Sequence, residues 1–105
     1  MFNLSESNRY VVCVQRVDLR KGLDGLCGLI HYLSLSSTNG DVYVFFNKSR
    51  STMKLVHWER GGYVVYYKRL ERGRVSHKVF LKEGVGFRSM RWDELGLLID
   101  GISPF

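Results

Sequence analysis

The sequence predicts an α+β fold, a single small domain in which an antiparallel β-meander packs against two helices. Two observations predict it. Three strand-like runs follow one another over residues 41–70 with short connections, and a segment with helical spacing of apolar residues lies on each side of them. The 105 residues suit one domain over 1–105, and 45% hydrophobic residues are enough for a packed core.

The first strand and the first helix are predicted from two neighbouring segments. Residues 1–9 are polar and are expected to be loosely held, whereas residues 10–15 (YVVCVQ) are rich in β-branched side chains and predict a strand. Asp18 is a suitable N-cap for a helix over 19–34. Apolar residues recur there at steps of four and three, on one helical face: Leu19, Leu23, Leu26, Ile30 and Leu33.

Three glycines interrupt this helix. Gly22, Gly25 and Gly28 are three residues apart, and each weakens a helix by about 1 kcal/mol relative to alanine. They leave a stripe without side chains, which has two interpretations: tight packing of the helix on the sheet, or contact with a partner.

The central meander is predicted at 41–47, 53–59 and 62–70, because NKSRST and Arg60-Gly61 are connections of hairpin length. Both faces of these strands are apolar, which is unusual for an antiparallel sheet with one face in water. Either helices cover both faces, or an aromatic face serves for binding or self-association.

The last part of the chain is less regular. Residues 74–80 (RVSHKVF) are compatible with one more strand, and 81–87 with a glycine-containing turn. Ser89 is the expected N-cap and Gly101 the expected C-cap of a final helix over about 90–100. Its apolar side would be formed by Trp92, Leu95, Leu98 and Ile99.

Several functional classes are not expected. The N-terminal segment does not resemble a signal peptide, and no apolar run approaches the length of a membrane span, so we expect a cytoplasmic protein without membrane contact. Cys13 and Cys27 form no CxxC motif and are expected to be small buried residues. Without HExxH, a nucleophile elbow or a phosphate-binding loop, we expect no enzyme, no cofactor and no metal. His57 is expected to be a hydrogen-bonded histidine within the sheet.

Positive charge is concentrated in the second half of the chain. The formal net charge is +6, and the window from Arg60 to Arg91 holds nine Lys/Arg and two acids, a charge of +7. The rest of the chain holds seven bases and eight acids, a charge of −1. Such a distribution favours encounter with polyanions.

The stretch YKRLERGR contributes four of these nine Lys/Arg. Lys68, Arg69, Arg72 and Arg74 follow the apolar run GYVVY directly, and Gly73 permits the strand to end there. Arginine forks match phosphate oxygens bidentately, and nearby aromatic residues are typical of single-strand binders. The alternative is that these charges only keep a sheet edge soluble.

Three segments resemble one bacterial family. VDLRKGLDGL (17–26), the block from DVYVFFN to RLERGR (41–74) and ELGLLIDGI (94–102) are similar to motifs of the TnpB-type (second open reading frame) accessory protein of the insertion-sequence family numbered sixty-six. The resemblance covers residues 17–102. It departs from the family pattern after Arg74, where the sequence has VSHKVF.

The resemblance implies a non-catalytic accessory protein for transposition of a bacterial insertion sequence. The expected partners are DNA, at the ends of the element, and the transposase and other accessory protein of the same element, with a homodimer left open. Arg20 and Lys21 lie in one matching motif and the arginine-rich stretch in another. The expected nucleic-acid-binding residues are therefore Arg20, Lys21, Lys68, Arg69, Arg72 and Arg74. The alternative is an adaptor that docks the transposase through an apolar sheet face around Tyr43, Phe45, Trp58 and Tyr66.

Overall fold

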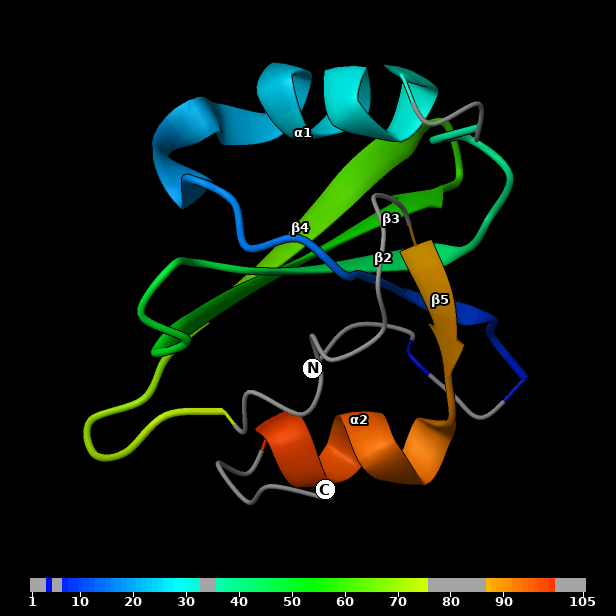
Figure 1. Cartoon of the computed structure of the whole chain (residues 1–105). Helices are drawn as coiled ribbons and strands as arrows, with labels where there is room; N and C mark the ends of the chain where they lie inside the picture. The colour runs from blue at the N-terminus through cyan, green and yellow to red at the C-terminus, as the bar shows by residue number, and fades with distance from the viewer. Residues whose placement is uncertain (1–3, 5–6, 33–35, 76–86, 100–105) are drawn as a thin grey trace.

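The fold is a mixed five-stranded sheet between two helices, seen in a computed structural model that describes residues 4, 7–32, 36–75 and 87–99 (Figure 1). Across the sheet the strand order is β4-β3-β2-β1-β5. In chain order the elements are β1 (Tyr10–Cys13), the 3₁₀ turn η1 (Leu19–Lys21), α1 (Gly22–Tyr32), β2 (Val42–Phe46), β3 (Thr52–Glu59), β4 (Gly62–Arg69), β5 (Phe87–Met90) and α2 (Trp92–Ile99).

The predicted α+β class and the meander are confirmed, and two strands are added to the meander. β2, β3 and β4 pair antiparallel in sequence order. β1 pairs parallel with β2, because α1 lies in the connection between them and carries the chain back to the same end of the sheet. β5 pairs antiparallel with β1, so β4 and β5 are the two edge strands of the sheet. The strand compatible with 74–80 lies mostly outside the described residues, since 76–86 are not described.

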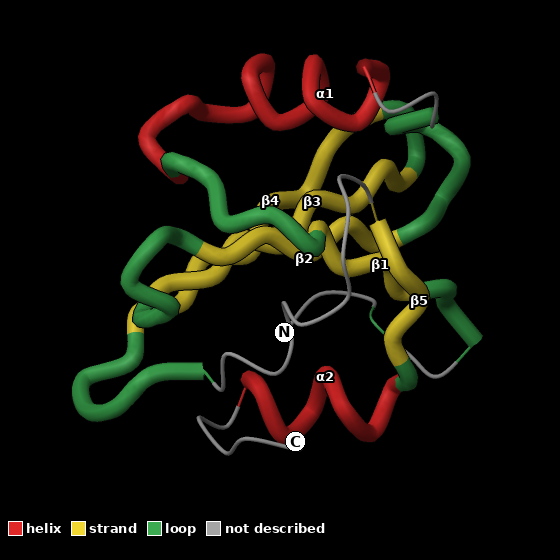
Figure 2. Tube along the Cα trace, in the orientation of Figure 1, coloured by secondary structure: helices red, strands yellow, loops and turns green. Residues whose placement is uncertain are grey.

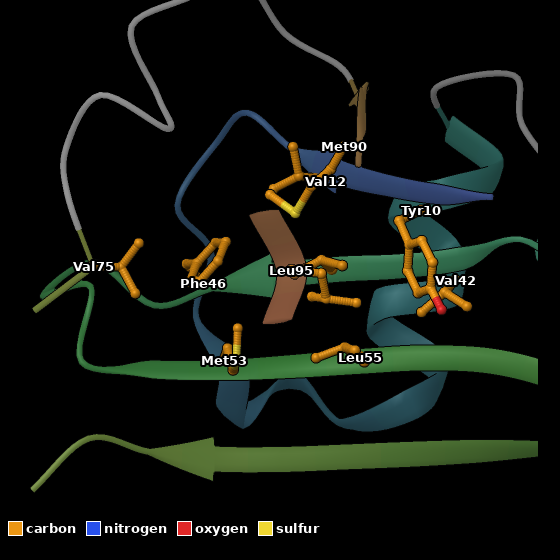
Figure 3. Packing of buried hydrophobic residues seen from close by; sticks show 10 residues of the cluster. Tyr10, Val12, Val42, Phe46, Met53, Leu55, Val75, Met90 and Leu95 are labelled. Carbon is orange, nitrogen blue, oxygen red and sulfur yellow. The ribbon is translucent and has the colours of Figure 1, made fainter. Parts of the chain in front are cut away.

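Helices cover both faces of the sheet, which explains why the strands are apolar on both sides. Figure 2 shows α1 over one face and α2 under the other. On the α1 side, Tyr43 and Phe45 of β2 pack with Leu26 and Ile30 of the helix. On the α2 side, Leu95 lies at the centre of a second cluster (Figure 3). Its other buried members are Tyr10, Val12, Val42, Val44, Phe46, Met53, Leu55, Val75 and Met90.

The helix boundaries differ from those predicted. Asp18 does act as an N-cap, but for the short turn η1, where its carboxylate accepts a hydrogen bond from the Arg20 backbone N–H. A continuous helix over 19–34 is wrong, because Gly22, with a φ of 73°, breaks the chain direction between η1 and α1.

The expected N-cap of the last helix is also wrong. Ser89 lies inside β5, and α2 begins at Trp92. The backbone N–H of Arg91, just before the helix, donates to a Glu94 carboxylate oxygen at 3.3 Å. This is the reciprocal half of a capping box, so a glutamate in the first turn marks the helix start. The expected C-cap, Gly101, lies outside the described residues.

The glycine stripe of the first helix does not pack closely on the sheet. A Cβ atom at Gly28 would meet no heavy atom within 4 Å, and one at Gly25 would meet the Cβ of Lys21 at 2.7 Å, within the same segment. The interpretation as a close helix–sheet contact is therefore wrong. Gly22 is needed for its positive φ.

These environments predict opposite effects for two alanine substitutions. Gly28→Ala is expected to raise the free energy of unfolding by about 0.5–1 kcal/mol, because alanine restricts the unfolded chain and clashes with nothing. Gly22→Ala is expected to lower it by about 1 kcal/mol or more, because its φ is strained for a residue with a Cβ. Urea unfolding measures both. Loss of stability in Gly28→Ala would contradict the open environment of that glycine.

Candidate nucleic-acid interface

Three loops meet at one end of the sheet. They are the segment 14–21 after β1, the β2–β3 turn at 47–51, and the segment 70–75 after β4, all on the left in Figure 1. Backbone hydrogen bonds join the last two, from Leu70 N–H to the Ser51 carbonyl at 2.7 Å and from Val75 N–H to the Arg50 carbonyl at 2.8 Å. The first loop is joined to the end of β2, directly before the β2–β3 turn, by the hydrogen bond from Val17 N–H to the Phe46 carbonyl at 2.9 Å, so the three loops form one continuous surface.

This surface and the strand residues next to it are strongly cationic, and we call them the basic end. Within the described part of the chain it holds ten Lys/Arg and three acids (Asp18, Asp24 and Glu71), a formal charge of +7. The bases are Arg16, Arg20, Lys21, Lys48, Arg50, Lys54, Lys68, Arg69, Arg72 and Arg74.

The opposite end of the same strands carries no such excess. Its described charged residues are three arginines and four acids, a formal charge of −1: Arg9, Arg60, Arg91, Asp41, Glu59, Asp93 and Glu94. Two of these arginines lie beside acids, with Arg9 at 3.7 Å from Asp41 and Arg91 at 3.0 Å from Asp93. The molecule is thus electrically polarised along its strands.

An open groove of about 480 Å³ lies in the basic end. One wall is η1 and the residues before it, and the other is the β2–β3 turn. Tyr67 of β4 contributes an exposed ring, 56% accessible. The groove is lined by Val17, Asp18, Leu19, Arg20, Asn47, Lys48, Ser49, Thr52 and Tyr67.

Lys54 fixes the shape of this groove rather than lining it. Its ammonium Nζ donates to the Leu19 carbonyl oxygen at 2.8 Å and lies 5.8 Å from the centre of the Tyr67 ring. It thereby ties η1 to the sheet and supports the ring from one side.

The predicted cations of the arginine-rich stretch do not share one face. Side chains alternate along β4, so Arg69 lies on the same face as Tyr67, beside the groove, whereas Lys68 lies on the other. Lys68 borders a small hollow with Met53, Leu70 and Val75.

Arg72 and Arg74 follow on the exposed loop after β4. Arg69 is 67% exposed and only loosely paired, at 3.9 Å from the Glu71 carboxylate. Three of the four predicted cations, Arg69, Arg72 and Arg74, therefore lie beside the groove or on the adjoining loop. The fourth, Lys68, lies on the opposite face of β4.

Arg20 is already paired. Its Nε and Nη2 groups donate to the two oxygens of Asp18 at 2.9 and 2.7 Å. These hydrogen bonds, with the one from the Arg20 backbone N–H, hold the pKa of Asp18 well below its usual range. Lys21 is exposed and adjacent. Asp18 thus offsets part of the positive charge that the sequence places here.

This ion pair predicts a pH-dependent stability. Because the folded-state pKa of Asp18 is lowered, its stabilising contribution is present above the unfolded-state pKa of about 3.9 and is lost as the pH falls from there through the folded-state pKa. Asp18→Asn keeps a capping side chain but removes the charge. The difference in Tm between wild type and variant should be largest near neutral pH and shrink in acid. A difference independent of pH would contradict this role.

Sequence patterns did not reveal several cations of the basic end. Arg16, Lys48 and Arg50 lie in the first half of the chain, outside the window from Arg60 to Arg91 where the positive charge is concentrated. No motif distinguishes them, and only the strand order brings their loops beside the end of β4. Arg16 and Lys48 are in contact, since Nη1 of Arg16 donates to the Lys48 carbonyl at 3.4 Å.

The described residues hold no candidate metal site. They contain no group of three His, Cys, Asp or Glu residues that could hold a metal ion. His31 Nε2, Ser37 Oγ and Tyr63 OH form a chain of hydrogen bonds of 2.9 and 2.7 Å. Ser37 is only 1% exposed, and the chain of hydrogen bonds ties the end of α1 to β4.

His57 and the two cysteines are buried inside the domain. His57 is buried within β3, as expected, but within the described region its Nδ1 has no hydrogen-bond partner, so the expected hydrogen bonding is not met at this nitrogen. Cys13 and Cys27 are both buried free thiols, as expected, and burial raises the pKa of Cys13. Within the described residues, no helix is long and apolar enough to cross a membrane.

The fold and this surface define a small α+β domain whose main chemical feature is a cationic sheet end. Comparison with known proteins adds the family. The chain belongs to the family described as IS66 Orf2 like protein, whose model matches residues 8–104, and it is thus an accessory protein of IS66 transposition. It is also similar to the uncharacterized protein y4jC of Sinorhizobium fredii (strain NBRC 101917 / NGR234), with 30% identity over 103 residues, 97% of this chain and 86% of that protein. No solved structure matches it.

Proposed function

We propose that this protein assists transposition as a non-catalytic DNA-binding factor and that the basic end contacts the phosphate backbone. The observation that supports this most is the separation of charge, +7 at one end of the sheet against −1 at the other, over the described residues. Cations collected from three separate loops on one surface raise the rate of encounter with a polyanion. Edge protection alone would require charges only along β4.

The proposed set of phosphate-binding residues is revised by the geometry. Arg69, Arg72 and Arg74 approach the DNA with Lys21 and Lys48 from the facing loops. Arg20 contributes through the part of its guanidinium that does not pair with Asp18. Lys68 is left out, because it lies on the opposite face of β4. Six such contacts span the groove and both of its rims.

Tyr67 gives the same surface an aromatic platform. Its exposed ring at the groove, with Lys54 on one side, resembles the stacking positions of proteins that hold unpaired bases. We therefore expect the basic end to accept the distorted or single-stranded DNA of a transposition intermediate at least as well as a regular duplex.

The alternative of an adaptor using the apolar sheet face has less support, because two of its four residues are fully covered. Tyr43 and Phe45 have no exposed area, because α1 covers them, and Tyr66 packs against the other core. Trp58 and Tyr66 are half-buried and lie on opposite faces of the sheet, so the four residues do not form one surface.

The test is a binding titration over a series of salt concentrations. The chain is mixed with duplex carrying the terminal inverted repeat of its element and with a scrambled duplex. For six phosphate contacts we expect the logarithm of the association constant to fall against the logarithm of salt with a slope of about −5. Preference for the repeat would add sequence recognition. Absence of binding by the folded chain at low salt would overturn the proposal.

A further inference from the structure

The strand β4 is the outermost strand of the sheet on one side, and no described strand pairs with its outer edge. The two-residue turn Arg60-Gly61 is closed by the pair Glu59 and Gly62, and in such hairpins the closing pair is hydrogen-bonded. Every second residue from Gly62 onward therefore bonds to β3, a pattern that continues to Leu70 N–H on the Ser51 carbonyl. The backbone groups of the residues between them point away from β3: Tyr63, Val65, Tyr67 and Arg69.

This edge has few of the features that normally prevent pairing. It is eight residues long, against four for β5 at the other edge, and its register with β3 runs without a bulge from end to end. It contains no proline. No strand in the described part of the chain pairs with its outer side. A long, regular and unpaired edge is a template for another strand.

We propose that β4 pairs antiparallel with β4 of a second copy, with Val65 opposite the partner's Val65. The sequence of the strand is self-complementary in this register. Tyr63 lies opposite the partner's Tyr67, and Val64 opposite the partner's Tyr66, so apolar residues meet apolar residues. The cations Lys68 and Arg69 lie opposite glycines, Gly62 and Gly61 of the partner subunit.

Charge selects the antiparallel arrangement. Two copies side by side in opposite directions place the basic end of each beside the −1 end of the other. If the pairing were instead centred on Lys68, the Lys68 side chains of the two copies would face each other. Like charges directly opposite each other destabilise a strand pair. Pairing also covers part of Val65 and Tyr67, which are 42% and 56% exposed in the single chain.

The consequence is a two-fold dimer with one continuous sheet. Both α1 helices would lie on the same face, and the two basic ends would lie at opposite ends of that sheet. Dimer formation does not depend on DNA binding, so it is tested on the protein alone and its failure leaves the proposed function standing.

The first test is the mass in solution, by sedimentation equilibrium up to submillimolar concentration. We expect twice the 12.2 kDa of one chain for the wild type. Val65→Lys and Val65→Glu should each be monomeric, because like charges face each other, and an equimolar mixture should recover the dimer mass. Leu97→Lys, at an exposed position of α2, is the matched control and should remain dimeric. A monomeric wild type, or a dimer unaffected by either change at Val65, would overturn the proposal.

The second test measures the register by disulfide formation. Opposed residues of a hydrogen-bonded antiparallel pair have Cα atoms about 5.5 Å apart, within the range of a disulfide. Because both native cysteines are buried, an introduced thiol is the reactive one. Under mild oxidation Val65→Cys should cross-link to its own copy, and Arg69→Cys, which faces glycine, should not. Cross-linking of Val64→Cys or Tyr66→Cys in preference to Val65→Cys would overturn this register.

Discussion

Alanine at Arg69, Arg72 and Arg74 together is expected to make the salt dependence of DNA binding much shallower. The slope of the logarithm of the association constant against the logarithm of salt should become less negative by about 2.7, or about 0.9 for each phosphate that is no longer neutralised. Affinity at low salt should fall by orders of magnitude, because phosphate contacts supply most of non-specific binding. A titration of the variant beside the wild type measures both quantities.

The matched control removes the same charge from the other end of the sheet. Arg9, Arg60 and Arg91 lie there, and two of them are paired with acids. Alanine at these three positions lowers the net charge by the same amount but should leave the slope nearly unchanged. Equal decreases in affinity for both triple variants would mean that net charge, and not the basic end, attracts the DNA.

A single substitution should act in the opposite direction. Asp18→Asn releases the Arg20 guanidinium from its carboxylate partner and keeps the side-chain cap of η1. We expect tighter binding and a more negative slope from this variant. Weaker binding would indicate that the ion pair holds Arg20 in its DNA-binding position.

Leu95→Ala is expected to be strongly destabilising. Leu95 has no exposed area and lies at the centre of its cluster (Figure 3). Truncating such a leucine costs about 2–5 kcal/mol, since both the transfer energy and a cavity contribute. This is a large fraction of the stability of a small domain, about 5–15 kcal/mol.

Leu97→Ala provides the comparison on the same helix. Leu97 is 38% exposed, and exposed substitutions usually change stability by no more than about 0.5 kcal/mol. Chemical denaturation of the two variants measures the difference. Similar decreases in stability at both positions would contradict the packing of α2 against the sheet.

The sequence determined the local elements where periodicity was strong. The strand-like apolar runs and short turns of 41–70 predicted β2, β3 and β4 to within one residue at every end. Prediction from local patterns failed at two helix boundaries, where another feature of the chain overrode the pattern. Leucine spacing predicted one long helix over 19–34, but the positive φ at Gly22 splits it. At the last helix, Ser89 resembled a cap, although it lies in a strand that pairs with β1.

What only the tertiary structure decided is which residues share a surface. The sequence located the cations of the stretch at 68–74 but could not separate Lys68 from Arg69 by face, nor add Arg16, Lys48 and Arg50 from distant loops. The sequence left two explanations for strands that are apolar on both sides: coverage by helices, or an aromatic face used for binding. The structure shows helices on both faces. The physical reason is that periodicity is a property of neighbours along the chain. Pairing partners are chosen by burial and backbone hydrogen bonding between segments far apart in sequence.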